Sequence, residues 1–344
     1  MISPIEWLDN KVKILDQTRL PDRMVYIETS DYHDVVAAIS DLKVRGAPAI
    51  GVAAAYGIAL GALKIKARTK EAFIQELGNI TRAFASSRPT AVNLFKTIEK
   101  MERLAKEEEY VESLQPLLVA VAKNIHAEEK GASQRLSTFG TELIKDNFTI
   151  LTHCNTGALA TAASGSALGI VFAAKERGLN IKVIATETRP LLQGARLTML
   201  ELLDAQIPAT LIVDSAAGYF MKAGKVNCVI VGADRIAANG DTANKIGTYS
   251  LAVVAHENKI PFYIAAPVTT LDPAIASGTQ IKIEERDPSE VTNWKDVRFP
   301  PAGIQAANPA FDVTPNNYIT AIITDKGIAE QPYTRTLGQL LEES

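Results

Sequence analysis

Short apolar runs alternate with amphipathic stretches from Asn147 to the end of the chain. The apolar runs have the length and composition of buried strands, and the stretches between them have helical spacing. Strands that alternate with helices build parallel sheets with both faces covered, so this half predicts a Rossmann-like α/β domain. The expected strands are 148–152, 181–185, 209–213, 226–231, 261–265 and 319–324, and the expected helices are 159–176, 193–205, 216–223 and 248–257.

The first part of the chain shows mainly helical patterning. Met24–Ile27 is expected to be a short strand, and the expected helices are 32–41, from 49 onward, 69–86 and 90–105, followed by one or two helices over 114–143. The boundary is expected in the helical region 125–145. We therefore divide the chain into a mainly helical N-terminal domain at 1–130 and a Rossmann-like parallel-sheet domain at 131–344.

One segment, 47–63, carries no charge and is rich in alanine and glycine. It is slightly shorter than the roughly 20 residues that a bilayer requires, and it contains Pro48 and Tyr56. We interpret it as a close-packed buried helix and expect no membrane partner.

Composition limits the classes of function. The chain has 344 residues, 47% hydrophobic and 22% charged, which is ordinary for a globular protein long enough for two domains. The net charge is -3, so the chain lacks the excess of positive charge that attracts nucleic acid, and we expect no nucleic-acid partner. Two cysteines and no recognisable signal peptide predict a reducing cytoplasm, not a disulfide scaffold.

Polar side chains follow four consecutive predicted strands. One polar tip is weak evidence, because Asp and Ser also cap helices. Four tips on one edge of a parallel sheet indicate a shared ligand crevice, since open α/β sheets bind ligands beyond the carboxyl ends of their strands. The tips carry His153, Cys154 and Asn155; Thr186, Glu187, Thr188 and Arg189; Asp214 and Ser215; and Asp234 and Arg235.

Cys154 and Asp234 are the two tip residues best suited to chemistry. Cys154 precedes a helix expected near Ala158, whose N-terminus would favour a thiolate or a proton carrier, although a buried packing cysteine fits equally well. Asp234 follows Gly232-Ala233 and fits a general acid/base, or a structural cap or ion pair. Cys228 lies within an apolar run and is interpreted as a packing residue.

Several segments suit a phosphate or sugar hydroxyls. Lys245 stands just before an expected helix, where an anion is stabilised. Arg45 adds a forked donor beside the small residues of 46–51, and Arg88 and Gln193 are similar candidates. Exposed cations or tight helix packing would explain the same residues, so these alternatives stay open.

Other chemistries lack their signatures. The four histidines are scattered, and no His, Cys or Asp group has the spacing of metal ligands. The sequence contains no dinucleotide-binding G-x-G-x-x-G after the first strand of the sheet domain, no Walker loop and no G-x-S-x-G elbow. We therefore expect no metal and no cofactor.

An ordered set of short segments resembles the methylthioribose-1-phosphate isomerase family over nearly the whole chain. The segments are RGAPAIG (45–51), SRPT (87–90), HCNTG (153–157), ETRP (187–190), QGARLT (193–198), GADR (232–235), NKIGT (244–248), IEER (283–286) and NPAFDVTP (308–315). Each segment is short, but the ordered set is highly specific.

The resemblance implies a metal-free aldose–ketose isomerase of methionine salvage, which converts 5-methylthioribose 1-phosphate to 5-methylthioribulose 1-phosphate. It implies a cytoplasmic homodimer whose small-molecule substrate is a sugar phosphate. Cys154 and Asp234 become the catalytic pair. The implied substrate contacts are Arg45, Gly46, Ala47, Arg88, Gln193, Asn244 and Lys245.

The resemblance leaves alternatives open. Hydrogen transfer between the two carbons can proceed as a proton or as a hydride. A ribose-1,5-bisphosphate isomerase shares these motifs and would need a second cationic site at the C5 end of the sugar. Regulatory subunits of initiation factor 2B share the fold without catalysis, but the joint presence of Cys154, Asp234 and the Asn244–Lys245 pair favours an enzyme.

Overall fold

The computed structural model describes residues 2–88 and 91–342. The chain divides into two compact units. Unit 1 comprises Met1–Ser133 and Gly157–Gly165, and unit 2 comprises Gln134–Thr156 and Ser166–Ser344. The segment Gly157–Gly165 therefore leaves unit 2 directly after the predicted catalytic loop and folds with unit 1.

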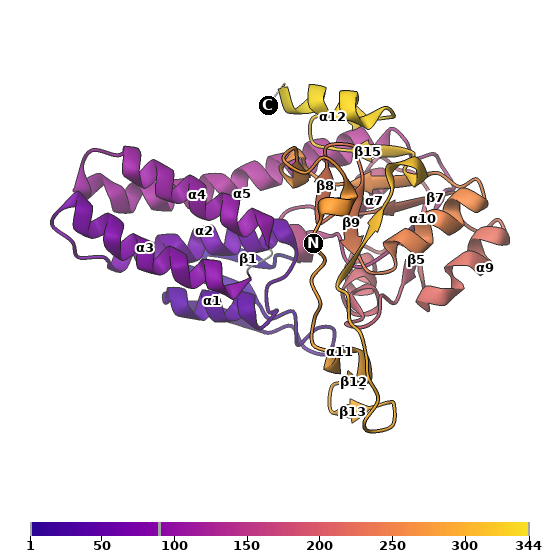
Figure 1. Ribbon diagram of the computed structural model, residues 1–344, viewed down its shortest axis with the longest axis horizontal. Coiled ribbons are helices and arrows are strands. Elements are labelled where there is room, and N and C mark those ends of the chain that lie inside the picture. The colour runs from indigo at the N-terminus through magenta and orange to yellow at the C-terminus, as the bar shows by residue number, and fades with distance from the viewer. Residues whose placement is uncertain (1, 89–90, 343–344) are drawn as a thin grey trace. The chain divides into compact units, whose positions relative to one another are not determined.

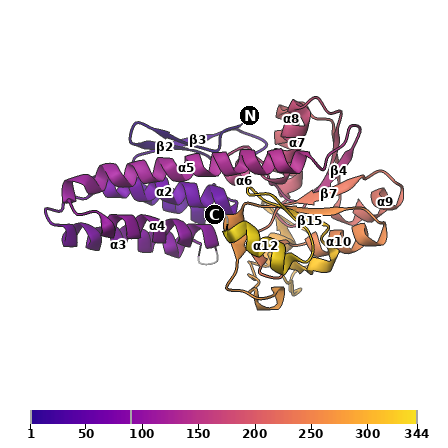
Figure 2. The same ribbon diagram turned by 90° about the horizontal axis from the view of Figure 1, so that it is seen from above.

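Unit 1 is built around helix α2, which packs against α1, α3 and α4 (Figures 1 and 2). Hydrophobic residues at helical spacing, such as Phe73, Leu77 and Phe84 of α3, turn one face of each helix into the core. The helices are α1 (Tyr32–Ser40), α2 (Ala47–Lys64), α3 (Lys70–Ser87), α4 (Val92–Glu107), α5 (Val111–Thr141) and α6 (Ala158–Thr161). The helical prediction for the first part of the chain is confirmed, and the region expected as one or two helices over 114–143 is the single helix α5, Val111–Thr141.

Helix α2 is the uncharged segment of the sequence. Among the described residues it is the one helix that is long and apolar enough to cross a membrane by length and composition. Within the protein, 78% of this stretch is buried, and its residues form the centre of the unit 1 core. The structure thus agrees with the interpretation of a close-packed buried helix.

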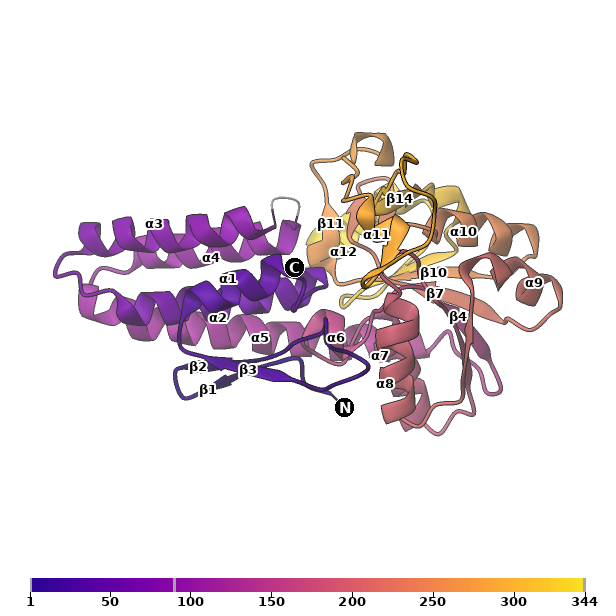
Figure 3. The ribbon, with the colours of Figure 1, turned by 90° about the horizontal axis from the view of Figure 1, so that it is seen from below.

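The sequence prediction missed a small antiparallel sheet at the start of unit 1. Its strands are β1 (Ile5–Leu8), β2 (Lys11–Leu15) and β3 (Tyr26–Thr29), in the order β1-β2-β3, beside α2 (Figure 3). The strand expected at Met24–Ile27 is therefore displaced by two residues. These strands are short and carry charged residues on their open face, so their alternation is weak, and packing on a helix stabilises them.

Unit 2 contains a seven-stranded sheet in the order β16-β15-β10-β7-β4-β5-β6. All neighbours are parallel except β15 and β16. Every strand expected from the sequence is present, which confirms the α/β fold class. The strands are β4 (Thr149–Thr152), β5 (Lys182–Thr186), β6 (Ala209–Ile212), β7 (Cys228–Val231), β10 (Phe262–Ala265), β15 (Ala321–Ile323) and β16 (Ile328–Ala329).

Both faces of this sheet are buried, because successive side chains of a strand point to opposite faces. On β7, Val229 and Val231 join one core with α9 (Ala217–Lys222), α10 (Thr248–Glu257) and α12 (Tyr333–Glu342). Cys228 and Ile230 join the other core with the end of α5 and with α7 (Ala167–Glu176) and α8 (Met199–Asp204). Strands that are buried on both faces consist of continuous apolar residues, and this is why the sequence predicted the strands of this sheet clearly.

Two expected helices are interrupted. The prediction of one helix over 159–176 is wrong: α6 ends at Thr161 and α7 begins at Ala167. The break begins where Ala162 adopts a left-handed conformation, with φ of 58°. The helix expected over 193–205 begins as a π-helical turn, Gly194–Thr198, before α8.

A second small sheet of unit 2 carries several site residues. Its order is β11-β8-β9-β14, with β11 (Leu271–Asp272), β8 (Arg235–Ala237), β9 (Thr242–Lys245) and β14 (Phe311–Thr314). Strands β8 and β9 form a hairpin around the turn at Asn239-Gly240-Asp241. A short helix α11 (Ser289–Thr292) and the hairpin β12 (Asn293–Trp294) and β13 (Val297–Arg298) complete the unit.

Candidate active site

Cys154 and Asp234 lie beyond the carboxyl ends of two adjacent parallel strands, β4 and β7. Ile150 of β4 is in register with Cys228 of β7, so the same register carries Cys154 to the level of Gly232. Asp234 follows two residues later. Both side chains are partly accessible, which leaves each of them open to a ligand at this edge of the sheet.

The backbone of Cys154 is held in an uncommon conformation. Its φ is 63°, in the left-handed region that non-glycine residues rarely adopt. Its N–H donates to Thr188 Oγ1 at 2.8 Å, and its carbonyl accepts from Thr198 Oγ1 at 2.6 Å. Such strained residues persist where surrounding contacts fix them, and they cluster at functional sites.

The backbone of Thr188 is also fixed, by a residue that follows the neighbouring strand β6. It also has a φ of 63°, a strained value for a β-branched residue. Asp214 Oδ1 accepts the N–H of Thr188 and Asp214 Oδ2 accepts that of Arg189, both at 2.7 Å. The tips of β4, β5 and β6 are therefore joined by one hydrogen-bonded chain that ends at Cys154.

His153 connects the tip of β4 to the end of β9. A carbonyl can only accept, so His153 Nε2–H donates to Ile246 O at 2.8 Å and Nδ1 accepts from Thr186 Oγ1 at 2.6 Å. Burial lowers the pKa of His153 below its usual 6.5. The imidazole is neutral and both of its nitrogens are engaged, which makes it a structural link beside the cysteine.

Asp234 and Asn244 face each other across the β8–β9 hairpin. Arg235 pairs with Ala243 in the antiparallel register, and the Asp234 N–H donates to Ala243 O at 2.9 Å. Continuing this register by one residue pair beyond Arg235 and Ala243 sets Asp234 opposite Asn244. Asn244 is 5% exposed and donates to Thr248 Oγ1 at 3.0 Å, so its amide is oriented beside the carboxylate.

Lys245 is a cation buried next to this pair, with 7% of its surface exposed. Its Nζ donates to Ala310 O at 3.1 Å and lies 4.9 Å from the centre of the Phe311 ring. An ammonium group has three protons, and burial strengthens its attraction for an anion. Lys245 is therefore a suitable partner for a phosphate oxygen.

Gln193 reaches the same region from the loop after β5. The Leu192 N–H donates to Thr188 O at 2.8 Å, which anchors the loop next to the threonine that holds Cys154. Gln193 is 4% exposed, and its Oε1 has no hydrogen-bond partner among residues 2–88 and 91–342. A buried acceptor without a partner is costly, so a donor such as a sugar hydroxyl is expected to satisfy it.

The remaining predicted contacts lie in unit 1. Gly46 has a φ of 90° just before α2, and a Cβ there would overlap the backbone of Ala160 on α6. Glycine is therefore required at this position. Arg45 and Ala47 flank it and are half-buried, as is Arg88 at the end of α3. Pro89 and Thr90 of the predicted segment lie outside the described residues.

Three of the predicted site residues, Cys154, Gln193 and Asp234, thus lie beyond the carboxyl ends of β4, β5 and β7, and Asn244 and Lys245 end strand β9, which pairs with β8 directly after Asp234. Lys245 ends strand β9 and stands three residues before α10 begins at Thr248, so the sequence was right to place it just before a helix. The sequence also expected a helix dipole to act on Cys154, but α6 is a single turn and its dipole is small.

Sequence reasoning missed the supporting roles of three residues. Thr188 and Asp214 were noted as polar strand tips, which was the only available signal for their function in holding Cys154. Asp312 accepts the N–H groups of Gly247 and Tyr249 at 2.7 and 3.0 Å and fixes the turn between β9 and α10. Burial raises the pKa of its carboxyl group. Among the described residues, no three His, Cys, Asp or Glu side chains gather as a metal site.

Comparisons with known proteins show which family this chain is similar to. The Initiation factor 2 subunit family matches residues 43–331. A methylthioribose-1-phosphate isomerase of Acetivibrio thermocellus is 52% identical over 338 residues, which cover 98% of this chain and 99% of the relative.

Two solved structures share the fold over their whole length. The 5-methylthioribose 1-phosphate isomerase from Pyrococcus horikoshii OT3 has a TM-score of 0.93 and 41% identity, with 100% of this chain and 97% of that chain covered. The translation initiation factor eIF-2B, subunit delta, from A. fulgidus has a TM-score of 0.90 and 41% identity, with 99% and 100% covered.

Proposed function

The chain belongs to the Initiation factor 2 subunit family as one of its methylthioribose-1-phosphate isomerases, and we propose that Cys154 and Asp234 carry out its chemistry. The reaction is the conversion of 5-methylthioribose 1-phosphate to 5-methylthioribulose 1-phosphate in methionine salvage. One observation carries the assignment of the catalytic pair: a thiol and a carboxyl group follow adjacent parallel strands, at the edge where α/β sheets bind ligands.

The substrate explains why two groups are needed. Its anomeric oxygen carries a phosphate, so the ring cannot open by the route of a free aldose. The net change breaks the bond between C1 and the ring oxygen, moves one hydrogen from C2 to C1 and leaves a carbonyl at C2. One group must therefore exchange protons with oxygen, and a second must act at carbon.

Asp234 handles the proton at the ring or hydroxyl oxygen. Its partly enclosed position beside Asn244 suits a general acid/base. Cys154 carries the proton from C2 to C1 or stabilises the intermediate between them. The hydrogen bonds to Thr188 and Thr198 hold the thiol in place during this step.

The phosphate and the hydroxyls are shared among the remaining predicted residues. Lys245 supplies charge and Asn244 supplies an oriented amide, while the buried Oε1 of Gln193 accepts a hydroxyl proton. Arg45 and Arg88 supply forked donors, and Gly46 and Ala47 supply backbone N–H groups.

Turnover in deuterated water distinguishes the two routes for hydrogen. Transfer by Cys154 as a proton predicts that solvent deuterium enters the product at C1. A product without deuterium would favour a direct hydride shift from C2 to C1. Asp234 would then still exchange a proton with the substrate oxygen, and Cys154 would lose its role as a proton carrier.

The C5 substituent decides between two sugar substrates. A methylthio group requires an apolar surface, whereas ribose 1,5-bisphosphate requires a second cationic site. The purified enzyme is expected to turn over 5-methylthioribose 1-phosphate with the higher kcat/KM. A preference for the bisphosphate would contradict this assignment.

A regulatory role is the second candidate, because an initiation factor subunit is as similar in structure as an isomerase is. The 52% identity to a curated isomerase and the joint presence of Cys154, Asp234 and Lys245 favour the enzyme. Absence of turnover on both sugars, together with binding of a larger protein partner, would reverse this choice.

We also propose a cytoplasmic homodimer. Leu211 and Val213 lie on or next to the edge strand β6 and are 45% and 52% exposed, which suits a second copy. Both cysteines are free, as a reducing compartment predicts. Light scattering after size exclusion is expected to give twice the 37.0 kDa chain mass, and a monomer would contradict the dimer.

A further inference from the structure

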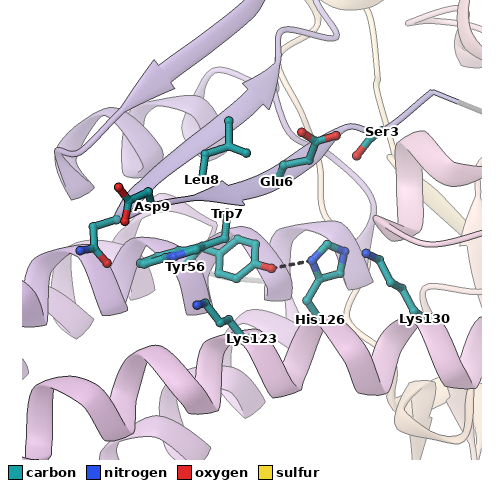
Figure 4. A pocket seen from close by; sticks show the side chains of 10 residues that line it. Ser3, Glu6, Trp7, Leu8, Asp9, Tyr56, Lys123, His126 and Lys130 are labelled. Atoms are coloured by element: carbon teal, nitrogen blue, oxygen red, sulfur yellow. Dashed lines mark hydrogen bonds between the residues drawn. The ribbon is translucent and has the colours of Figure 1, made fainter.

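Unit 1 contains a cavity that shares no residue with the proposed active site. Its volume is about 630 Å³, within the roughly 300–1,000 Å³ typical of small-molecule pockets. Strand β1 and the turn after it form one wall, α2 forms the floor, and α5 forms the other wall (Figure 4). The lining residues are Ser3, Glu6, Trp7, Leu8, Asp9, Asn10, Tyr56, Lys123, His126 and Lys130.

Aromatic rings line the interior of this cavity. The rings of Trp7 and Tyr56 lie 5.4 Å apart between centroids and are tilted by 48° (Figure 4). Trp7 is only half-buried, and its indole N–H has no hydrogen-bond partner among the described residues. Half-exposed indoles are suited to stacking on a planar ring, and their N–H can bind an acceptor.

Hydrogen bonds fix one polar residue of α2 and one of α5 inside the cavity. His126 Nε2–H donates to Ala162 O at 2.7 Å, and its Nδ1 accepts from the Tyr56 hydroxyl at 2.6 Å. Burial raises the pKa of Tyr56 to about 12, so the phenol stays protonated. Its oxygen keeps the capacity to accept one hydrogen bond, which gives the floor a fixed acceptor.

Two lysines of α5 give the cavity its charge. Lys123 and Lys130 are seven residues apart, which separates them by about 10 Å along the helix. Neither forms an ion pair with a carboxylate among the described residues. Lys123 Nζ lies 5.9 Å from the Trp7 ring, near the outer limit of a cation–π contact. Glu6 on the opposite wall is directed to Lys13, at 3.9 Å.

We propose that this cavity binds an anionic small molecule with a planar ring, of the nucleoside monophosphate class. The base stacks on Trp7 and the phosphate binds Lys130. The distance between the two lysines matches a ligand with its ring at one end and its charge at the other. Asp9 and the Tyr56 oxygen accept hydrogen bonds from the hydroxyls or the amino group of such a ligand.

The cavity also adjoins the segment that follows the catalytic cysteine in the chain. His126 holds Ala162, which belongs to Gly157–Gly165. Gln17 Nε2 donates to Leu159 O at 2.8 Å in the same segment. The ligand site therefore shares one lining residue, His126, with the contacts that fix this segment in unit 1.

Tryptophan fluorescence tests the site directly, because the chain has two tryptophans and only Trp7 lines the cavity. Trp294→Phe leaves Trp7 as the sole reporter. Titration with adenosine 5′-monophosphate is expected to quench this fluorescence saturably. The double variant K123A/K130A is expected to weaken binding at least about tenfold, because it removes the charged donors.

The controls separate the parts of the proposal. K222A/K225A removes two exposed lysines of unit 2 and is expected to leave the affinity unchanged. Inorganic phosphate and adenosine are each expected to bind more weakly than the nucleotide. If Trp294→Phe fails to fold, calorimetry on the wild-type enzyme and the two double-lysine variants measures the same affinities.

Three results would overturn the proposal. One is no saturable signal with adenosine, guanosine, cytidine or uridine monophosphate. Another is equal affinity of wild type and K123A/K130A. The third is inorganic phosphate binding as tightly as the nucleotides, which would leave no role for Trp7.

Discussion

The backbone of Cys154, the proposed catalytic cysteine, is held by residues that do not react in the proposed mechanism. Cys154 and Thr188 both have a φ of 63°, and one hydrogen bond of 2.8 Å joins them. Asp214 then fixes the backbone of Thr188. The sequence identified Cys154 because a thiol at a strand tip is a recognisable signal. It could not identify Thr188 as a positioning residue, because that role depends on the register between β4 and β5.

Replacing Thr188 tests this arrangement. Thr188→Val removes the hydroxyl acceptor of the Cys154 N–H and keeps the shape of the side chain. We expect kcat to fall by about tenfold to a hundredfold, because small displacements of a reacting group are costly, while KM changes little.

The matched control is Thr141→Val on α5, a buried threonine whose hydroxyl donates to Ser137 O at 2.5 Å. It is expected to lower stability and leave kcat unchanged. Equal effects of the two variants on kcat would remove Thr188 from the positioning role.

His126 gives unit 1 a pH dependence. Burial, with a smaller contribution from Lys130, lowers its pKa below the usual 6.5. As pH falls below about 6.5, the unfolded chain takes up a proton that native His126 does not. The free energy of unfolding should therefore fall from pH 7 to pH 5.

Urea unfolding of His126→Gln measures this contribution. The variant is expected to show a shallower fall of stability with pH than the wild type does. His256→Gln, which changes an exposed histidine, should keep the wild-type slope. A His126→Gln profile parallel to that of the wild type would show that this histidine does not carry the effect.

Among the strands, those that are buried on both faces of the sheet could be predicted from the sequence. The strands of the seven-stranded sheet are continuous apolar runs, and the sequence located all those it named. The strands β1–β3, β8, β9 and β14 are short and mix polar with apolar residues, so their pairing depends on tertiary contacts. The break between α6 and α7 depends on Ala162, which carries no sequence signal for a helix end.

Helix α2 offers a prediction at the level of one element. A Cβ on Gly57 would overlap the ring of Phe84 on α3 and come within 3.1 Å of Val35 Cγ1 on α1. Gly57→Ala should destabilise the protein by about 1–3 kcal/mol, because the packed helices must separate.

Gly338→Ala is the matched control. This glycine lies in α12, and no atom lies within 4 Å of an added Cβ. The change is expected to be neutral or to stabilise by up to about 1 kcal/mol, since alanine is the better helix former. Equal urea midpoints for Gly57→Ala and wild type would contradict close packing around α2.

At the scale of the whole molecule, the sequence predicted a mainly helical region followed by a Rossmann-like α/β region, and the structure has both. The chemistry assigned to the edge of the sheet stays a prediction. The sequence did not predict that Gly157–Gly165 folds with unit 1, because this depends on contacts such as Gln17 with Leu159. The shared position of Cys154 and Asp234 at one edge of the sheet was predictable, because parallel strands bring their carboxyl ends to one edge, whatever their separation in the chain.

The central claim is that Asp234 is the acid/base of a sugar-phosphate isomerase. The most direct measurement is the turnover of 5-methylthioribose 1-phosphate by Asp234→Asn, with the exposed Asp296→Asn as control. We expect Asp234→Asn to lose about 10²–10⁴-fold in kcat while folding normally, as removal of a general acid/base does, and Asp296→Asn to match the wild type. Near-normal turnover by a folded Asp234→Asn variant would contradict the account.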